Sequence, residues 1–573
     1  MTAQTPRFQY RLDIPRPSSD QGYVTLTLTG IKLKSATFCM PAWSPGNYRI
    51  VDYGRWVDSV QAWDIKGKEI SVSRLNNNEW FVKNARQLAR ITYRIHDIPE
   101  DSVPVLPTTL NSMDRSTFFY NGPSVFGYIK GYQTEACQVE FQLPCGWRVW
   151  TPLSRISDFR YAARSYDELV DAPALLGTWP IEAFRFTLDS TDYHFVINSE
   201  TDIKTDTLLN LAKTIIRYQN RLFDDRPSEA YYFLYNFFAA GSRYGALEST
   251  RASSYYLPPF ASQRNLRSSY LIRVLAHEFF HRWNPERFHP KELHIINYQA
   301  PLRIQNLWFI EGVTEYYAQL TLMRTGLLSK KVFYNTFRDI AAENPSANLE
   351  TLSRNASEIG VAPAMYTQGS LTAWLMDIEM RDRTDNAVSM DSLMVRMHRA
   401  FGKKDKPYDD KTLIMTIKQF TGVDFTSFYS HYIAGGKPLP VREILEKAGL
   451  AYDIIYTPAH GWFWDVSAGG KLVVQSVSEN STAFALGLQS GDIVTSIQEQ
   501  TLPTTMDGIR TRIEALESLS VGESVRLMVQ RNGKPIALKG TIVASQKPTV
   551  SIKEIAAPTE KQLRIRQSIL SSP

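Results

Sequence analysis

Residues His277-Glu278-Phe279-Phe280-His281 have the pattern H-E-x-x-H. Four-residue spacing on a helix places the two imidazoles about 40° apart around the axis, so both can ligate one metal ion. Glu278 lies about 60° to one side, within reach of a water on that metal without being a ligand. Two neutral nitrogen ligands and a carboxylate that takes a proton from water are the parts of a zinc hydrolase.

A helix must hold these side chains in place, and the flanking sequence predicts one. Ser268 and Ser269 offer N-caps, and Pro285 should end the helix near Asn284 because it pushes its predecessor out of the α region. The alternative is an ordinary helix with two partly buried histidines and an exposed Glu278. The apolar face argues against it, since an unpaired polar group buried there would be costly. That face consists of Leu271, Val274, Leu275 and Phe279.

A catalytic zinc needs a third protein ligand and an open fourth position. Residues 307–317 predict a second helix that is apolar except for Glu311 and Glu315, which lie one turn apart on the same face. One carboxylate would ligate the metal, and the other would accept the free N–H of a ligand histidine. The pair suits Glu311 as ligand and Glu315 as acceptor, although spacing alone does not settle the choice. A solvated helix face is the alternative, which disagrees with the aromatic neighbours Trp308, Phe309, Tyr316 and Tyr317.

The two motifs together resemble a known family. H-E-F-F-H-R-W-N, followed thirty residues after the second histidine by the glutamate of W-F-I-E-G-V-T-E-Y-Y, is similar to the glycyl aminopeptidases. These are zinc peptidases related to aminopeptidase N and thermolysin that carry a C-terminal PDZ domain. Aminopeptidase N itself has a shorter gap. The resemblance implies one Zn²⁺ per chain, held by His277, His281 and Glu311, with Glu278 as the general base.

A third motif, Gly245-Ala246-Leu247-Glu248, is similar to the G-x-x-E segment of these aminopeptidases. The resemblance implies that Gly245 and Ala246 line the cleft in an edge strand and that Glu248 binds the substrate's free α-amine. A carboxylate suits that task, because a buried ammonium must be paired. Ser249 stands where family members usually have histidine, and without the resemblance Glu248 would be taken for an exposed loop residue.

A fourth motif, Tyr366-Thr367-Gln368-Gly369, resembles the Y-x-K-G segment of the family, with Gln368 in place of the usual lysine. The resemblance implies that the Tyr366 hydroxyl hydrogen-bonds the tetrahedral oxyanion. A tyrosine can donate to developing negative charge without being charged itself. The alternative is one more aromatic residue in a chain with 29 tyrosines.

Bulk properties limit the classes of function. A hydrophobic content of 43% and a charged content of 21% fit a soluble globular protein, and the net charge of +6 predicts neither a nucleic-acid partner nor an anionic membrane. There is no 18-residue apolar run, so we expect no membrane span. Residues 1–10 show no signal peptide, although a trimmed secretory chain would look the same.

Cys39, Cys137 and Cys145 lack metal-type spacing. A Cys137–Cys145 disulfide is one alternative, but we expect free thiols and a cytoplasmic protein.

At 573 residues the chain should form several domains. We expect an N-terminal β-sandwich over residues 1–180 that packs on the catalytic domain and helps to wall the cleft. The alternative is an independent binding module. Residues 181–455 predict a thermolysin-like domain, α/β and then helical. Residues 456–548 resemble a PDZ domain through A-x-x-x-G-L-x-x-G-D-x-V, and PDZ domains capture a peptide C-terminus by strand addition. Residues 549–573 are polar and are expected to be a loosely ordered tail.

These features predict a zinc aminopeptidase that acts on peptides with a free N-terminus. The family resemblance adds a preference for small first residues, Gly and Ala. One alternative is a zinc endopeptidase of the same fold. The other is a peptide-binding adaptor in which the PDZ domain matters and the metal site is vestigial. The presence of every expected zinc ligand and of the base argues against the adaptor.

Overall fold

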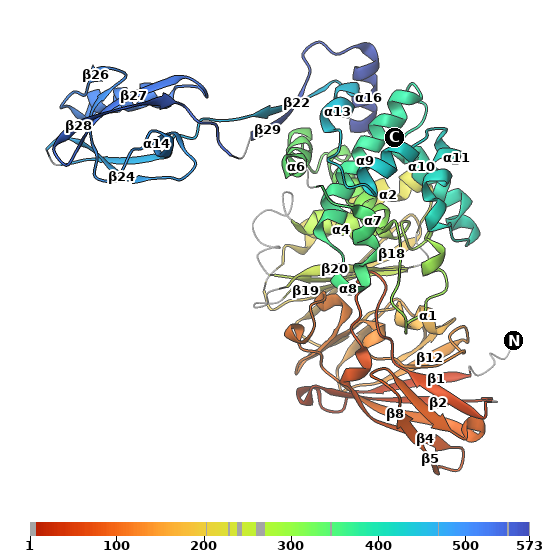
Figure 1. Ribbon diagram of the computed structural model, residues 1–573. Helices are drawn as coiled ribbons and strands as arrows, with labels where there is room; N and C mark the ends of the chain where they lie inside the picture. Colours follow the sequence, from red (N-terminus) through yellow and green to blue (C-terminus); the bar gives the residue numbers. More distant parts are fainter. Residues whose placement is uncertain are drawn as a thin grey trace. The chain divides into compact units, whose positions relative to one another are not determined.

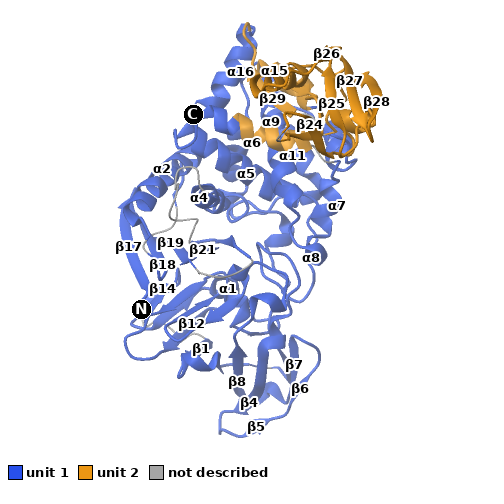
Figure 2. Ribbon diagram, turned by 90° about the vertical axis from the view of Figure 1, so that its left-hand side faces the viewer, with its two compact units in different colours: residues 1–333, 344–440, 558–573 blue, residues 334–343, 441–557 orange. Residues whose placement is uncertain are grey.

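The computed structural model describes residues 7–31, 33–201, 203–226, 230–237, 243–258, 270–343, 346–467, 469–546 and 549–571 (Figure 1). The chain divides into two compact units, coloured in Figure 2. Unit 1 contains residues 1–333, 344–440 and 558–573, and unit 2 contains residues 334–343 and 441–557.

The N-terminal part of unit 1 is rich in β-strands, as expected for residues 1–180. Its largest sheet has eight strands in the order β14 (Ser154–Ser157), β15 (Arg160–Ala163), β12 (Cys137–Gln142), β1 (Phe8–Asp13), β2 (Gln21–Leu28), β8 (Leu88–His96), β4 (Val57–Asp64) and β5 (Glu69–Ile70). Two four-stranded sheets accompany it. Their orders are β13 (Arg148–Trp150), β16 (Ala174–Gly177), β10 (Thr117–Tyr120), β9 (Asn111–Met113), and β11 (Tyr128–Ile129), β3 (Ser35–Cys39), β7 (Glu79–Lys83), β6 (Val72–Arg74).

One hydrophobic core joins these sheets, which makes the domain a β-sandwich. Alternate residues of β2 and β8, such as Leu26 and Tyr93, point into it and meet Phe38 and Trp80 from another sheet. The domain packs on the catalytic part of unit 1 through main-chain contacts. The Ala42 N–H donates to the Tyr298 carbonyl (2.7 Å).

The catalytic part begins with a five-stranded sheet in the order β17 (Ile181–Leu188), β18 (Thr191–Asn198), β19 (Ala230–Phe237), β21 (Ala252–Leu257), β20 (Gly245–Ser249). Strands β18, β19 and β21 run parallel, and the outer strands β17 and β20 pair antiparallel to their neighbours. The sheet leaves β20 at one edge.

Helices follow the sheet, in the order the sequence predicts. The long ones are α2 (Thr205–Phe223), α4 (Tyr270–His281), α5 (Leu307–Arg324), α6 (Lys330–Glu343), α9 (Pro363–Arg383), α10 (Met390–Ala400) and α11 (Leu413–Thr421). The short ones in unit 1 are α1 (Tyr166–Val170), α7 (Leu349–Arg354), α8 (Ala356–Ile359) and α12 (Thr426–Phe428). All eighteen residues of α5 are buried, so this helix forms the centre of the domain.

Unit 2 contains the PDZ fold. Its sheet runs β23 (Trp462–Val466), β24 (Leu472–Val477), β25 (Ile493–Ile497), β27 (Ser524–Arg531), β28 (Lys534–Thr541), with β26 (Gln500–Thr501) paired to β25. Helices α14 (Thr482–Ala485) and α15 (Met506–Glu517) add Ala483, Ile509 and Leu516 to the core. The unit also holds α13 (Val441–Lys447). In the sequence signature, Asp492 forms an ion pair with Arg531 (2.7 Å).

The C-terminal segment corrects one expectation. Composition predicted a loose tail over 549–573, but the structure forms β29 (Thr549–Glu554), which pairs with β22 (Leu450–Ile455), and helix α16 (Glu560–Leu570). Thr559 and Gln562 form a capping box at the start of α16. Ile565 and Ile569, four residues apart, are buried. These two signals, a cap and an apolar stripe, override the polar composition.

Two further expectations concern membranes and cysteines. Within the described residues, none of the helices combines the length and the apolar character that a membrane crossing requires. Cys39, Cys137 and Cys145 are free thiols, the first two buried and the third exposed, so no disulfide joins Cys137 to Cys145.

Candidate metal centre and active site

Helix α4 brings the H-E-x-x-H motif to a buried position, with His277 4% and His281 1% exposed. The expected caps Ser268 and Ser269 lie outside the described residues. The helix ends at His281 rather than at Asn284. The next backbone N–H groups bond three residues back, Arg282 to Phe279 and Trp283 to Phe280, so the chain leaves the helix in tighter turns.

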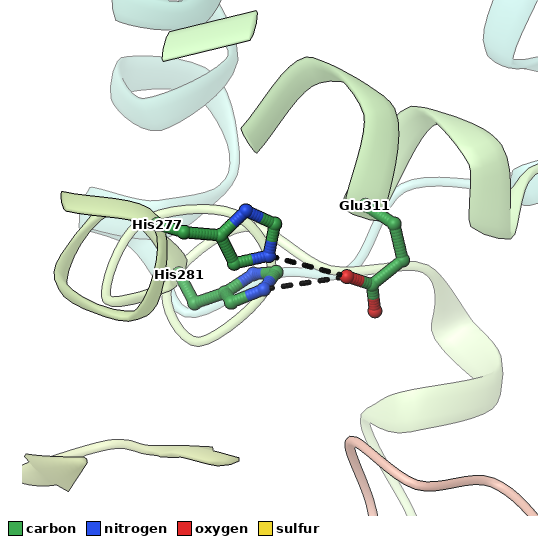
Figure 3. A group of neighbouring side chains, drawn as sticks. All are labelled: His277, His281 and Glu311. Carbon is green, nitrogen blue, oxygen red and sulfur yellow. Dashed lines mark ion pairs between the residues drawn. The ribbon is translucent and has the colours of Figure 1, made fainter. Parts of the chain in front are cut away.

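Glu311 on α5 faces both histidines, as Figure 3 shows. Its Oε2 atom lies 3.5 Å from Nε2 of His277 and 3.4 Å from Nε2 of His281. Ligands about 2.1 Å from a tetrahedral zinc are about 3.4 Å from one another. The three side chains therefore fit one zinc ion, and among the described residues they form a group whose ligand atoms all lie within 4.8 Å.

The outer nitrogens of the two histidines are also held. His277 Nδ1 lies 3.1 Å from Oε2 of Glu315, and this carboxylate also accepts from Arg273 (2.7 Å) and Gln319 (2.9 Å). His281 Nδ1 lies 2.8 Å from the Asn284 carbonyl. Each contact fixes a ring so that Nε2 points to Glu311. The sequence spacing did not decide which of the two carboxylates is the ligand. In the structure Glu311 faces the Nε2 atoms and Glu315 faces Nδ1 of His277.

Burial and charge act in opposite directions in this cluster. Burial alone would raise the pKa of Glu311, but His281 and His277 outweigh it and lower the pKa to about 2. Burial likewise disfavours the charged form of His281, yet Glu248 and Glu311 raise its pKa to about 10. The carboxylates around the histidines therefore favour positive charge at this point.

Glu278 projects from α4 beside the ligands and is buried, with no hydrogen-bond partner for Oε2 within the described chain. Burial raises its pKa to about 7; Glu248 and Glu311 act in the same direction, and His277 and His281 oppose them. A carboxylate whose pKa lies near neutrality and whose oxygen is free has the properties of a general base.

Glu248 lies on β20, the edge strand predicted for this segment, together with Gly245 and Ala246. One Glu248 carboxylate oxygen, one from Glu278 and one His281 nitrogen lie within 4.8 Å of one another. Gly46 of the N-terminal domain packs against this point. A Cβ there would lie 2.4 Å from the Leu247 side chain and 2.9 Å from that of Glu248, and φ is +80°, so glycine favours this close approach of the loop.

Tyr366 reaches the centre from α9, and its ring centroid is 5.6 Å from that of His277. The approach depends on a close crossing of α5 and α9 at two glycines. A Cβ on Gly312 would lie 2.5 Å from backbone atoms of Gly369. Because Gly369 is one turn after Tyr366 and Gly312 follows Glu311, this crossing sets Tyr366 beside the Glu311 carboxylate.

Beyond Glu248 lies a pocket of about 410 Å³ that the motifs do not reveal. Its walls come from both domains and include Tyr48, Asp171, Glu248, Thr250 and Glu286. His289 and His294 also line it, with Nε2 of His289 3.0 Å from Nδ1 of His294. Asp171, Thr250 and Glu286 come from separate segments, so no local spacing could have joined them.

Comparison with family models identifies each part of the chain. Residues 9–178 match the peptidase M61 N-terminal domain, residues 270–387 match M61 glycyl aminopeptidase, and residues 449–540 match a PDZ domain. With the fold described above, these matches define a multidomain metallopeptidase with a PDZ domain. The chain belongs to the M61 glycyl aminopeptidase family.

Solved structures share the fold. An aminopeptidase N family protein from Idiomarina loihiensis is 19% identical with a TM-score of 0.74, covering 98% of this chain and 100% of its own. A variant of a two-domain M1 zinc metallopeptidase bound to L-arginine is 13% identical with a TM-score of 0.50, covering 76% and 95%. A search of curated protein sequences gave no match.

Proposed function

We propose that this metallopeptidase is a zinc aminopeptidase that removes the first residue of peptides with a free N-terminus. The observation that carries the proposal is the position of Glu248. Its carboxylate lies within 4.8 Å of Glu278 and His281, so an α-ammonium paired with Glu248 would place the first peptide bond next to the candidate metal ligands.

His277, His281 and Glu311 would hold the zinc ion, which when bound polarises a carbonyl and lowers the pKa of water to about 7. Glu278 takes the proton from the attacking water, for which its free Oε2 is placed, and passes it to the leaving amine. Tyr366 donates its hydroxyl hydrogen to the oxyanion that develops on the carbonyl.

Glu248 limits the reaction to the end of the chain because it pairs with a charged amine that internal residues lack. Among the described strands β20 is the last of its sheet, which supports this role, since an edge strand offers main-chain groups to an extended peptide. The family resemblance adds a preference for Gly and Ala as first residues.

The first test measures zinc content together with hydrolysis of alanine and glycine anilides, in wild type and in Glu278→Gln. We expect one zinc per chain in both proteins and a fall in kcat of about 10²- to 10⁴-fold in the variant. Retained activity in Glu278→Gln would contradict the assignment of the base.

A second variant separates exopeptidase from endopeptidase. Glu248→Gln should lose hydrolysis of free-amine substrates while it keeps its zinc, because a neutral amide cannot pair with an ammonium. Efficient cleavage of N-acetylated peptides by the wild type would instead indicate a zinc endopeptidase.

A further inference from the structure

The pocket beyond Glu248 is large for a site that takes only glycine or alanine. At about 410 Å³ it falls in the range of small-molecule sites. Glu248 belongs both to this pocket and to the group around His281. A substrate whose amine pairs with Glu248 therefore has the pocket directly beside its first residue. A methyl group or a hydrogen atom would leave most of that space to water.

Two carboxylates in the pocket wall meet at Thr250. The Thr250 N–H donates to Oδ2 of Asp171 (3.0 Å), and the Thr250 hydroxyl donates to Oε2 of Glu286 (2.6 Å). Neither carboxylate has an ion pair with a lysine or arginine within the described residues. Asp171 comes from the N-terminal domain and Glu286 from the segment after α4, so the pocket closes only when both domains are in place.

Four other charged side chains of the wall have partners within the described residues. Arg164 and Arg251 both face Glu168, at 2.9 Å and 3.7 Å. Asp167 accepts from the Tyr298 hydroxyl (2.8 Å). Asp171 and Glu286 therefore lack a cationic partner within the described part of the protein, and burial raises the pKa of both carboxyls. A buried carboxylate without a partner is costly, and a cation brought by a ligand would relieve that cost.

Tyr48 supplies an independent sign of a ligand. It lines the pocket and is 1% exposed, and its hydroxyl has no hydrogen-bond partner within the described chain. Burial raises the pKa of this hydroxyl well above its usual value, with Glu248, Glu311 and Glu286 adding to the effect. A buried polar group without a partner usually has one in the functional complex.

We propose that this pocket takes a cationic side chain, that of arginine or lysine, from the first residue of the substrate. Asp171 and Glu286 pair with the charge, and the Tyr48 hydroxyl accepts one of its N–H groups. Arginine has the better fit, because its planar fork of five donors can address two carboxylates and a hydroxyl at once. The proposal rests on the aminopeptidase function proposed above and extends the substrate range beyond the Gly and Ala implied by the family resemblance.

The test compares kcat/KM for arginine, citrulline and alanine anilides on the zinc-loaded full chain. Citrulline matches arginine in shape and lacks its charge, so the ratio of the two isolates the contribution of charge. We expect a ratio of tenfold or more in the wild type. Glu286→Gln and Asp171→Asn should each lower the ratio toward one, although both amides keep an oxygen that can accept from Thr250. Asp409→Asn, whose carboxylate pairs with Lys291 outside the pocket (3.1 Å), is the matched control and should keep the wild-type ratio.

The outcomes separate this proposal from the one on which it rests. If alanine anilide is cleaved and arginine gains nothing over citrulline, the pocket does not take a cation while the aminopeptidase function stands. If no free-amine anilide is cleaved, both proposals fail. Inhibition of alanine anilide cleavage by arginine amide against citrulline amide gives a readout that needs no variant. Equal inhibition by the two amides would overturn the cationic pocket.

Discussion

The metal centre and the pocket lie on the two sides of Glu248. Both bury a carboxyl group, but the pKa of that group moves in opposite directions. On one side Glu311 faces two imidazoles, and its pKa falls to about 2 although burial opposes this. On the other side Asp171 faces Thr250 and further carboxylates, and burial raises its pKa to about 7, with Glu248 and Glu168 adding to the rise. The difference is the presence of positive charge. At the metal centre the imidazoles supply positive charge, whereas in the pocket a ligand would have to bring it.

This comparison predicts two kinds of variant. A change at the metal centre should slow all substrates equally, because every substrate uses the same water and the same oxyanion site. A change in the pocket should alter the ratio between charged and neutral substrates. A centre variant that changed the ratio would break the distinction.

The largest effect is expected for Glu311→Gln. The amide keeps the size of the side chain and removes the anionic ligand between the two Nε2 atoms. Zinc content should fall well below one per chain, and hydrolysis of arginine and citrulline anilides should be lost together. Metal analysis after dialysis, with both activities, measures this.

Two further variants serve as comparisons for Glu311→Gln. Glu315→Gln removes the carboxylate held against Nδ1 of His277 and should weaken zinc affinity by only about 10- to 100-fold. Glu514→Gln, on the exposed face of α15, should change neither quantity. If Glu315→Gln lost zinc more completely than Glu311→Gln, the roles of the two carboxylates would have to be exchanged.

The next effect is expected for Tyr366→Phe, which removes one hydroxyl beside the centre. Loss of one oxyanion donor should lower kcat by about 10²- to 10³-fold with zinc retained. The arginine to citrulline ratio should stay constant, since Tyr366 stabilises a charge common to both reactions. Steady-state kinetics on the two anilides measure it, with the exposed Tyr456→Phe as control. A variant as active as the wild type would remove Tyr366 from the mechanism.

The two sides of Glu248 also differ in how much the sequence reveals. The two histidines of H-E-x-x-H lie on one helix, and helical spacing is enough to predict that they meet. That Glu311 on a second helix joins them was implied by the family resemblance. The G-x-x-E and Y-x-x-G segments became informative only through the family resemblance. Asp171, Thr250 and Glu286 meet because an N-terminal β-domain packs on a catalytic domain, and no local period encodes such packing.

The same limit explains the C-terminal segment. Its polar composition predicted a loosely ordered tail, while the capping box at Thr559 and the pair Ile565 and Ile569 specified a helix. A short amphipathic helix gains its stability from the surface that it covers. Arg324 on α5 donates to the Ile569 carbonyl (2.8 Å), a contact that only the folded protein provides.

The smallest effect, and the sharpest test of the comparison, is the pH dependence of the arginine to citrulline ratio. Asp171 has a raised pKa of about 7 in the free protein, so it is mostly neutral below pH 7 and mostly ionised above it. Only the ionised form pairs with a guanidinium. The value of kcat/KM reports groups of the free enzyme, so the ratio should rise about tenfold between pH 6 and pH 8.

Other charged groups near Asp171 could also cause the rise of the arginine to citrulline ratio around pH 7. Glu168, Glu248 and Glu286 lie close, and Arg251 is turned toward Glu168. Titration at the metal centre affects both substrates and cancels in the ratio. Asp171→Asn should therefore flatten the profile around pH 7. A step that persists in this variant would assign the titration to Glu286 or Glu248, and a flat wild-type profile would mean that Asp171 does not contact the substrate charge.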